Sequence, residues 1–172
     1  MNNETFDTAK FSDLINANSE YVDTFKYSEL TGSAARGLAI VTCMDSRINP
    51  LSVVGMRSGD AKILRNAGAR VTEDVLRTLV LATYLLNVDR ILVMPHTDCR
   101  MAQSEESNIH ELIESKFGVD TRSLEFRVTK DQEAALKTDI TRVRTYPLIR
   151  EGVSVAGAIY DVKTGKIDFK NF

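Results

Sequence analysis

An uninterrupted apolar segment, with little alternation between apolar and polar residues, runs from Gly37 to Met44. A strand exposed on one face alternates, whereas a parallel strand covered on both faces is apolar throughout. Shorter strand patterns follow at residues 61–64 and 89–94, and Pro95 limits the length of the latter. These segments predict a sheet that is mostly parallel and buried on both faces.

Three helices are expected after residues 61–64, each with a recognisable start. Thr72 is predicted as an N-cap because two acidic residues follow it and apolar residues then recur at helical spacing. Ser104 is predicted to cap a helix that Gly118 closes, and Thr129 begins a capping-box spacing before the third helix. The residues of the second helix expected to face the core are Ile109, Leu112, Ile113 and Phe117.

The two ends of the chain complete the predicted fold. Apolar residues at helical spacing indicate an N-terminal helical arm within residues 1–26. A C-terminal hairpin is expected within residues 153–169, turning at Thr164 and Gly165. Alternating strands and helices favour an α/β fold with a mostly parallel β-sheet flanked by helices. We predict a single domain over residues 1–172.

Composition excludes several classes of function. The formal net charge is −2 and no block of like charge occurs, which argues against nucleic acid or an anionic membrane as a partner. No apolar stretch approaches the ~20 residues of a membrane span. The first six residues lack the basic and apolar regions of a signal peptide. We therefore expect a cytoplasmic protein with reduced thiols.

The only two cysteines, Cys43 and Cys99, each lie near the end of a predicted strand, and His96 is close to the second. Ligands gather beyond the carboxyl ends of parallel strands, so these three side chains are expected to meet. Two thiolates and an imidazole suit Zn²⁺. A catalytic zinc site with three protein ligands keeps a position for water, whereas a structural site has four ligands.

Asp45 and Arg47 stand beside the first cysteine, two residues apart. A guanidinium can hold a carboxylate by two hydrogen bonds, and a carboxylate held this way can accept a proton from water and orient it. A released Asp45 would instead become a conditional fourth zinc ligand. The alternative interpretation is that Cys43 is a buried core thiol, His96 a loop histidine, and Asp45–Arg47 a surface or capping pair.

Three motifs together resemble the β-class carbonic anhydrases, most closely the short prokaryotic branch. They are Cys43-Met44-Asp45-Ser46-Arg47, Arg65-Asn66-Ala67-Gly68 and His96-Thr97-Asp98-Cys99, in that order. The resemblance implies that Cys43, His96 and Cys99 ligate zinc and that Asp45 and Arg47 act as a pair. It also implies a homodimer or a dimer of dimers, in which the N-terminal helix packs on the other subunit.

The function implied by this resemblance is the reversible hydration of carbon dioxide to bicarbonate by a zinc-bound hydroxide. One alternative is a related zinc hydrolase of another small substrate, carbon disulfide or carbonyl sulfide. The other is a non-catalytic zinc-binding module that Asp45 closes.

Three further residues carry expectations of their own. Arg100 stands where the family usually has glycine; we hypothesise that it slows turnover without loss of metal, with a solvent-facing side chain as the alternative. Strain is expected there if the backbone needs a positive φ. His110 is expected to be a solvated surface residue, with a proton shuttle near the site as the alternative. Asp98 is either an acceptor close to the site or a loop cap.

Overall fold

The computed structural model describes residues 7–172, so the first six residues of the predicted N-terminal arm lie outside it. The chain forms two compact units, divided between Thr31 and Gly32. Within the described residues, no helix is both long and apolar enough to cross a membrane.

The first unit holds a short 3-10 helix, η1 (Thr8–Phe11), and helix α1 (Ser12–Asp23). Asp7 caps the start of η1, because its side chain accepts a hydrogen bond from the Ala9 N–H at 3.1 Å. At the end of α1, the Phe25 ring contacts the rings of Tyr21 and Tyr27 edge to face. The predicted N-terminal helix is present, although it ends before Phe25.

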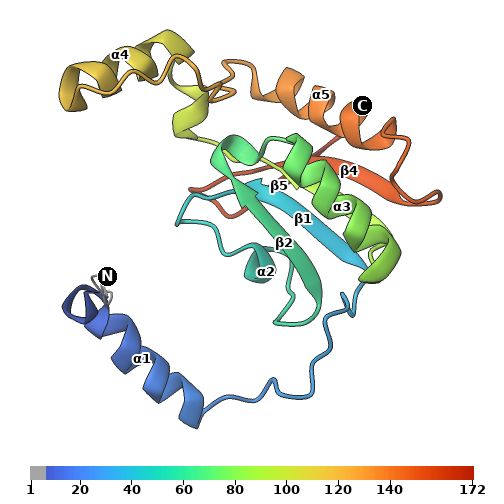
Figure 1. The fold of residues 1–172 in the computed structure, drawn as a ribbon. Helices are drawn as coiled ribbons and strands as arrows, with labels where there is room; N and C mark the ends of the chain where they lie inside the picture. The colour runs from blue at the N-terminus through green and yellow to red at the C-terminus, as the bar shows by residue number, and fades with distance from the viewer. Residues whose placement is uncertain (1–6) are drawn as a thin grey trace, which may run out of the picture. The chain divides into compact units, whose positions relative to one another are not determined.

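The second unit contains a five-stranded sheet of order β2-β1-β3-β4-β5 (Figure 1). Four strands are parallel: β1 (Leu38–Cys43), β2 (Ala61–Asn66), β3 (Arg90–Met94) and β4 (Ser154–Tyr160). The last strand, β5 (Ile167–Lys170), pairs antiparallel with β4. This confirms the predicted fold class, with a mostly parallel sheet and a C-terminal hairpin.

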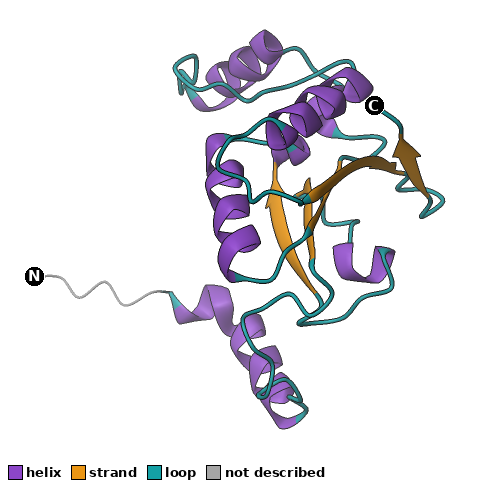
Figure 2. Cartoon of the chain, turned by 90° about the vertical axis from the view of Figure 1, so that its right-hand side faces the viewer, coloured by secondary structure: helices purple, strands orange, loops and turns teal. Residues whose placement is uncertain are grey.

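Helices cover both faces of this sheet (Figure 2). Helices α3 (Glu73–Leu85) and α5 (Gln132–Arg144) pack on one face, where Leu79 and Ile140 belong to one buried apolar cluster with Val41. The other face packs against α2 (Pro50–Val53), a short helix that the sequence did not predict. All six residues of β1 are buried, which accounts for its apolar sequence.

Two predicted helix starts are wrong and one is confirmed. The Thr72 side chain accepts a hydrogen bond from the Val75 N–H and starts α3. Helix α4 (Glu106–Phe117) instead follows Glu105, and Ser104 provides no cap. Asp131 caps α5, because its carboxylate accepts from the Ala134 N–H at 2.9 Å, a position that the capping-box spacing at Thr129 missed.

Helix α4 also differs in which face it buries. His110 is its only buried residue, whereas Leu112 is 41% and Phe117 73% exposed. The His110 Nδ1 lies 2.8 Å from the Thr121 hydroxyl and its ring packs against Phe126. The expectation of a solvated His110 is therefore wrong, because the segment after α4 folds back over the polar side of the helix.

Candidate metal centre

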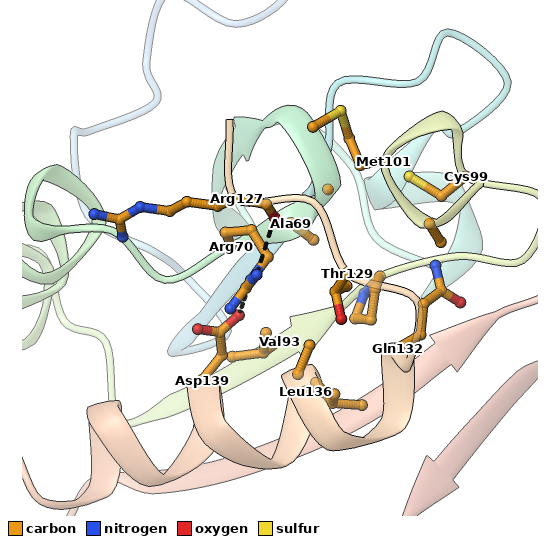
Figure 3. A pocket seen from close by; sticks show the side chains of 14 residues that line it. Ala69, Arg70, Val93, Cys99, Met101, Arg127, Thr129, Gln132, Leu136 and Asp139 are labelled. Carbon is orange, nitrogen blue, oxygen red and sulfur yellow. Dashed lines mark hydrogen bonds and ion pairs between the residues drawn. The ribbon is translucent and has the colours of Figure 1, made fainter. Parts of the chain in front are cut away.

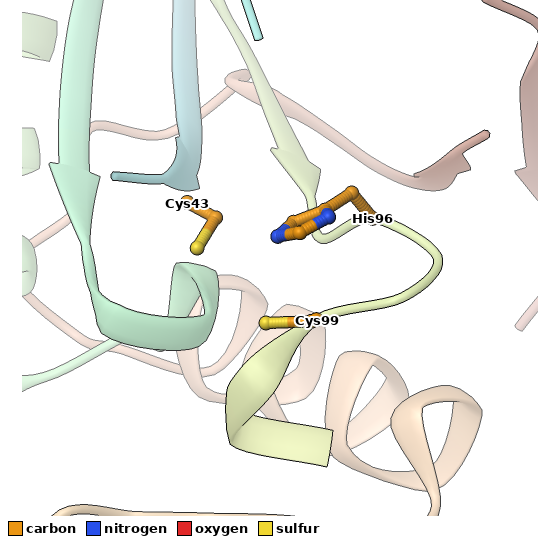
Figure 4. Close-up of side chains that lie close together, drawn as sticks. All are labelled: Cys43, His96 and Cys99. Carbon is orange, nitrogen blue, oxygen red and sulfur yellow. The ribbon is translucent and has the colours of Figure 1, made fainter. Parts of the chain in front are cut away.

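Three predicted ligands meet at the carboxyl ends of β1 and β3 (Figure 4). Cys43 is the last residue of β1, His96 follows β3, and Cys99 precedes the 3-10 helix η3 (Arg100–Ala102). The two sulfur atoms and a ring nitrogen of His96 lie within 4.8 Å of one another. All three residues are buried. Parallel pairing of β1 with β3 therefore brings together residues more than fifty positions apart in the chain.

His96 has the form that a metal ligand needs. Its Nδ1 lies 2.8 Å from the Thr97 carbonyl oxygen. Because a carbonyl only accepts, Nδ1 carries the proton and Nε2 keeps its lone pair. Nε2 is buried and has no hydrogen-bond partner among the described residues. A buried polar nitrogen without a partner is costly, and a cation between Nε2 and the two sulfurs would satisfy it.

The pKa values of the two thiols are shifted in opposite directions. The pKa of Cys43 is lowered, mainly by a hydrogen bond from Cys99. Burial raises this pKa, whereas hydrogen bonds from His96 and from the Gly68 N–H, 3.4 Å from the sulfur, lower it further. The same bond to Cys43, together with burial, raises the pKa of Cys99. Burial lowers the pKa of His96, but contacts with Cys43 outweigh it and the net shift is upward. The two sulfur atoms therefore interact with each other at a place where a divalent cation such as Zn²⁺ would bind both.

Asp45 and Arg47 form the predicted pair. The Arg47 Nε donates to Asp45 Oδ1 at 3.0 Å, and Nη2 donates to Oδ2 at 2.7 Å. The Arg47 backbone N–H also donates to Oδ1 at 2.9 Å. These hydrogen bonds hold the pKa of Asp45 well below its ordinary value, and the same carboxylate raises the pKa of Arg47. Asp45 is therefore a carboxylate that accepts hydrogen bonds and does not store a proton near neutral pH.

Asp45 lies at the edge of the three-ligand group and is not a member of it. Its Oδ2 is 3.7 Å from the His96 Nε2. With both oxygens engaged by Arg47, the carboxylate is held beside the ligand atoms at a distance that leaves Nε2 without a hydrogen bond.

Arg65 clamps the loop that carries Cys43, Asp45 and Arg47. Its Nε donates to the Cys43 carbonyl at 2.9 Å, Nη1 to the Ile48 carbonyl at 3.2 Å, and Nη2 to the Asp45 carbonyl at 2.5 Å. The sequence motif placed Arg65 near the site but gave no sign that its partners are backbone carbonyls. One guanidinium therefore fixes both ends of the loop.

Replacing Arg65 with alanine is expected to weaken zinc binding by about 10–100-fold, because partners that orient ligands contribute on this scale. Competition with a chelator of known affinity measures the change. Arg150→Ala is the matched control, since Arg150 also donates to two carbonyls, of Thr83 and Val88, which precede β3, whereas His96 follows it. Equal zinc affinity in the two variants would show that the clamp does not act on the metal site.

Arg100 does not have a positive φ, so the strain that we expected in that case does not arise. It opens η3 and is exposed, while the left-handed conformation belongs to Asp98, with φ 57°. The effect of Arg100 on turnover stays a prediction, which Arg100→Gly tests.

A cavity beside Cys99 lies between the 3-10 helix η2 (Ala67–Ala69), η3 and α5 (Figure 3). Its wall beside Cys99 is largely apolar and includes Val93, Met101 and Leu136. At its other end Arg70 Nε donates to Asp139 Oδ2 at 2.7 Å, while the buried Asp139 Oδ1 has no partner among residues 7–172. The cavity is therefore apolar at the end beside Cys99 and charged at the other end.

Comparison with known proteins agrees with this geometry. The family described as carbonic anhydrase matches residues 38–167. The chain is 31% identical to β-carbonic anhydrase 1 of Mycobacterium tuberculosis, covering 91% of this chain and 94% of that protein. The crystal structure of a carbonic anhydrase from Streptococcus mutans has a TM-score of 0.88 at 38% identity, over 97% of this chain and 99% of the other. A carbon disulfide hydrolase of Saccharolobus solfataricus is 30% identical over 77% of this chain and 76% of its own.

Proposed function

This chain belongs to the β-carbonic anhydrase family, and we propose that it catalyses the reversible hydration of carbon dioxide to bicarbonate with zinc held by Cys43, His96 and Cys99. The observation that carries the proposal is the buried group of two sulfurs and an unpartnered imidazole nitrogen. A bound zinc ion supplies Lewis acidity, which lowers the pKa of water so that it can act as a nucleophile near neutral pH.

The residues around the ligands have distinct roles in this proposal. Asp45 Oδ2 lies beside the ligand atoms and accepts a hydrogen bond from the attacking water. This hydrogen bond orients the water so that a lone pair on the water oxygen points at the substrate carbon. Arg47 holds Asp45 in this orientation and keeps it ionised. Because the pKa of Asp45 is low, the proton passes onward to buffer and does not remain on the carboxylate.

Two observations favour this activity over a closed, non-catalytic zinc module. Asp45 is bonded through both oxygens to Arg47, so closing the site would break two charge-assisted hydrogen bonds. The likeness to carbonic anhydrases also extends over nearly the whole chain.

Carbon disulfide and carbonyl sulfide are the competing substrates, because a carbon disulfide hydrolase is among the relatives and the cavity wall beside Cys99 is apolar. Zinc-loaded protein is assayed in parallel for carbon dioxide hydration, by pH change, and for hydrogen sulfide release from the two sulfur compounds. We expect carbon dioxide to have the higher kcat/KM by at least about 10²-fold, since a pocket fitted to one small substrate discriminates on this scale. Faster hydrogen sulfide release would reverse the assignment.

We also propose that the chain assembles as a homodimer or a dimer of dimers in the cytoplasm, where the thiol ligands stay reduced. The exposed apolar side chains of α1 support assembly, among them Leu14 at 59% and Val22 at 63% exposure. We expect light scattering at micromolar concentration to give at least twice the chain mass, and Leu14→Asp to lower it while zinc content is unchanged. Asn18→Asp, on the same helix, is the control; a monomeric wild type would contradict the proposal.

A further inference from the structure

Arg47 has a second carboxylate partner that the Asp45–Arg47 pair does not require. Its Nη1 donates to Asp98 Oδ2 at 2.8 Å, and its Nη2 donates to the Asp98 carbonyl at 3.1 Å. The guanidinium therefore lies between two acidic residues. It donates to Asp45 through Nε and Nη2 and to Asp98 through Nη1 and Nη2. Asp98 comes from the His96–Cys99 loop, so Arg47 joins the two loops that supply all three zinc ligands.

Asp98 is held in place independently of Arg47. Its other carboxylate oxygen, Oδ1, accepts from the Gln103 Nε2 at 2.6 Å. The preceding Thr97 fixes the loop to β4 and the hairpin, since its N–H donates to the Tyr160 carbonyl at 2.9 Å and its Oγ1 accepts from the Val162 N–H at 3.2 Å. The loop thus presents a rigidly placed carboxylate to the guanidinium.

The backbone and the hydrogen bonds of Asp98 argue against a role as a loop cap. Its φ of 57° is a left-handed conformation that costs most residues free energy and that Asp and Asn tolerate better. The helix η3 begins at the next turn without any side-chain cap. Both carboxylate oxygens bond instead to side chains, those of Arg47 and Gln103.

We propose that Asp98 is a positioning residue, which locks the Arg47 guanidinium so that Asp45 stays oriented beside the zinc ligands. Without the Asp98 carboxylate, Nη1 loses its partner, and the guanidinium is held only by Asp45 and by the backbone carbonyl of residue 98, so the Asp45–Arg47 pair is less firmly fixed. The Asp45 carboxylate, with Oδ2 3.7 Å from His96 Nε2, then loses its fixed position toward the metal. This inference rests on the proposed hydration activity.

Two substitutions separate the carboxylate from the backbone conformation. Asp98→Gly keeps the left-handed backbone without strain and removes the carboxylate; Asp98→Asn keeps both the conformation and an acceptor oxygen and removes the charge. We expect kcat for carbon dioxide hydration to fall at least ~10-fold in the glycine variant and to recover partly in the asparagine variant, at equal zinc content and unchanged KM. Gln103→Ala should lower kcat less, and should add nothing to Asp98→Gly.

Asp74→Asn is the matched control, because it removes another exposed carboxylate that accepts two hydrogen bonds from an arginine, Arg77, outside the site. We expect its kcat to equal that of the wild type. A similar loss in this control would mean that the effect of Asp98 is not specific, and would overturn the proposal.

A second measurement, NMR of the Arg47 side chain, monitors the guanidinium itself and does not depend on catalytic turnover. In zinc-loaded wild type we expect separate NMR signals for the two Arg47 Nη groups, because bonds to two carboxylates hinder rotation about Nε–Cζ. In Asp98→Gly the Nη1 signal should shift, because Nη1 loses its carboxylate partner while Nε and Nη2 keep Asp45, and Asp74→Asn should leave the Nη1 signal unchanged. Unchanged Arg47 signals with unchanged kcat, or loss of zinc from Asp98→Gly, would overturn the proposal. A zinc-loaded wild type without hydration activity would refute the proposed function instead, and the NMR comparison would still decide whether Asp98 locks Arg47.

Discussion

Replacing Cys43 with serine is expected to abolish carbon dioxide hydration and to lower zinc content from about one ion per chain to near zero. Cys43 supplies one of the two sulfur atoms of the proposed zinc site, at the end of β1. A serine hydroxyl stays protonated near neutral pH and leaves His96 and Cys99 as the only ligands. The variant should also unfold at lower temperature, because part of the metal-binding free energy is folding free energy.

Metal analysis after purification without chelator gives the zinc content, and thermal unfolding gives the stability. Ser46→Ala is the control, since it changes an exposed residue of the same loop and leaves every proposed ligand in place. Zinc retained by Cys43→Ser at the level of Ser46→Ala would remove Cys43 from the ligand set.

Replacing Asp45 with asparagine is expected to lower kcat by about 10²-fold or more while zinc content stays near one ion per chain, a scale typical of losing a positioned proton acceptor. Asparagine keeps one oxygen for Arg47 but presents an NH₂ group, which donates where the carboxylate accepted. The attacking water then loses the acceptor that orients it.

Asp120→Asn is the control for this variant. Asp120 Oδ1 also accepts from an arginine two residues later, through the Arg122 N–H at 2.9 Å and Nη1 at 3.1 Å. Steady-state kinetics at matched zinc content should show no change in this control. An Asp45→Asn protein as active as Asp120→Asn would mean that the carboxylate has no part in the reaction.

The elements that the sequence predicted correctly are those in which local chemistry and burial agree. The apolar run that ends at Cys43 forms a strand with every residue buried, and Gly165, with φ 75°, turns the predicted hairpin. The three ligands could be predicted because they follow strands whose ends meet at one edge of the sheet. The strand and the turn follow from residues close in sequence, and the meeting of the ligands follows from the general rule for the ends of parallel strands.

What the sequence did not reveal depends on contacts between distant segments. His110 is buried only because Thr121 and Phe126 fold back over it, so the apolar pattern of α4 predicted the wrong face. The three carbonyls that Arg65 binds carry no sequence signal, since every residue has one. The bond from Arg47 to Asp98 crosses between two loops and likewise appears only in the folded chain.

The central claim is that carbon dioxide hydration takes place at a zinc ion held by Cys43, His96 and Cys99. The most direct test is stopped-flow hydration measured while zinc is returned stepwise to metal-free protein. We expect the hydration rate to rise in proportion to bound zinc and to level off at about one ion per chain. A fully zinc-loaded protein that hydrates carbon dioxide no faster than buffer would contradict it.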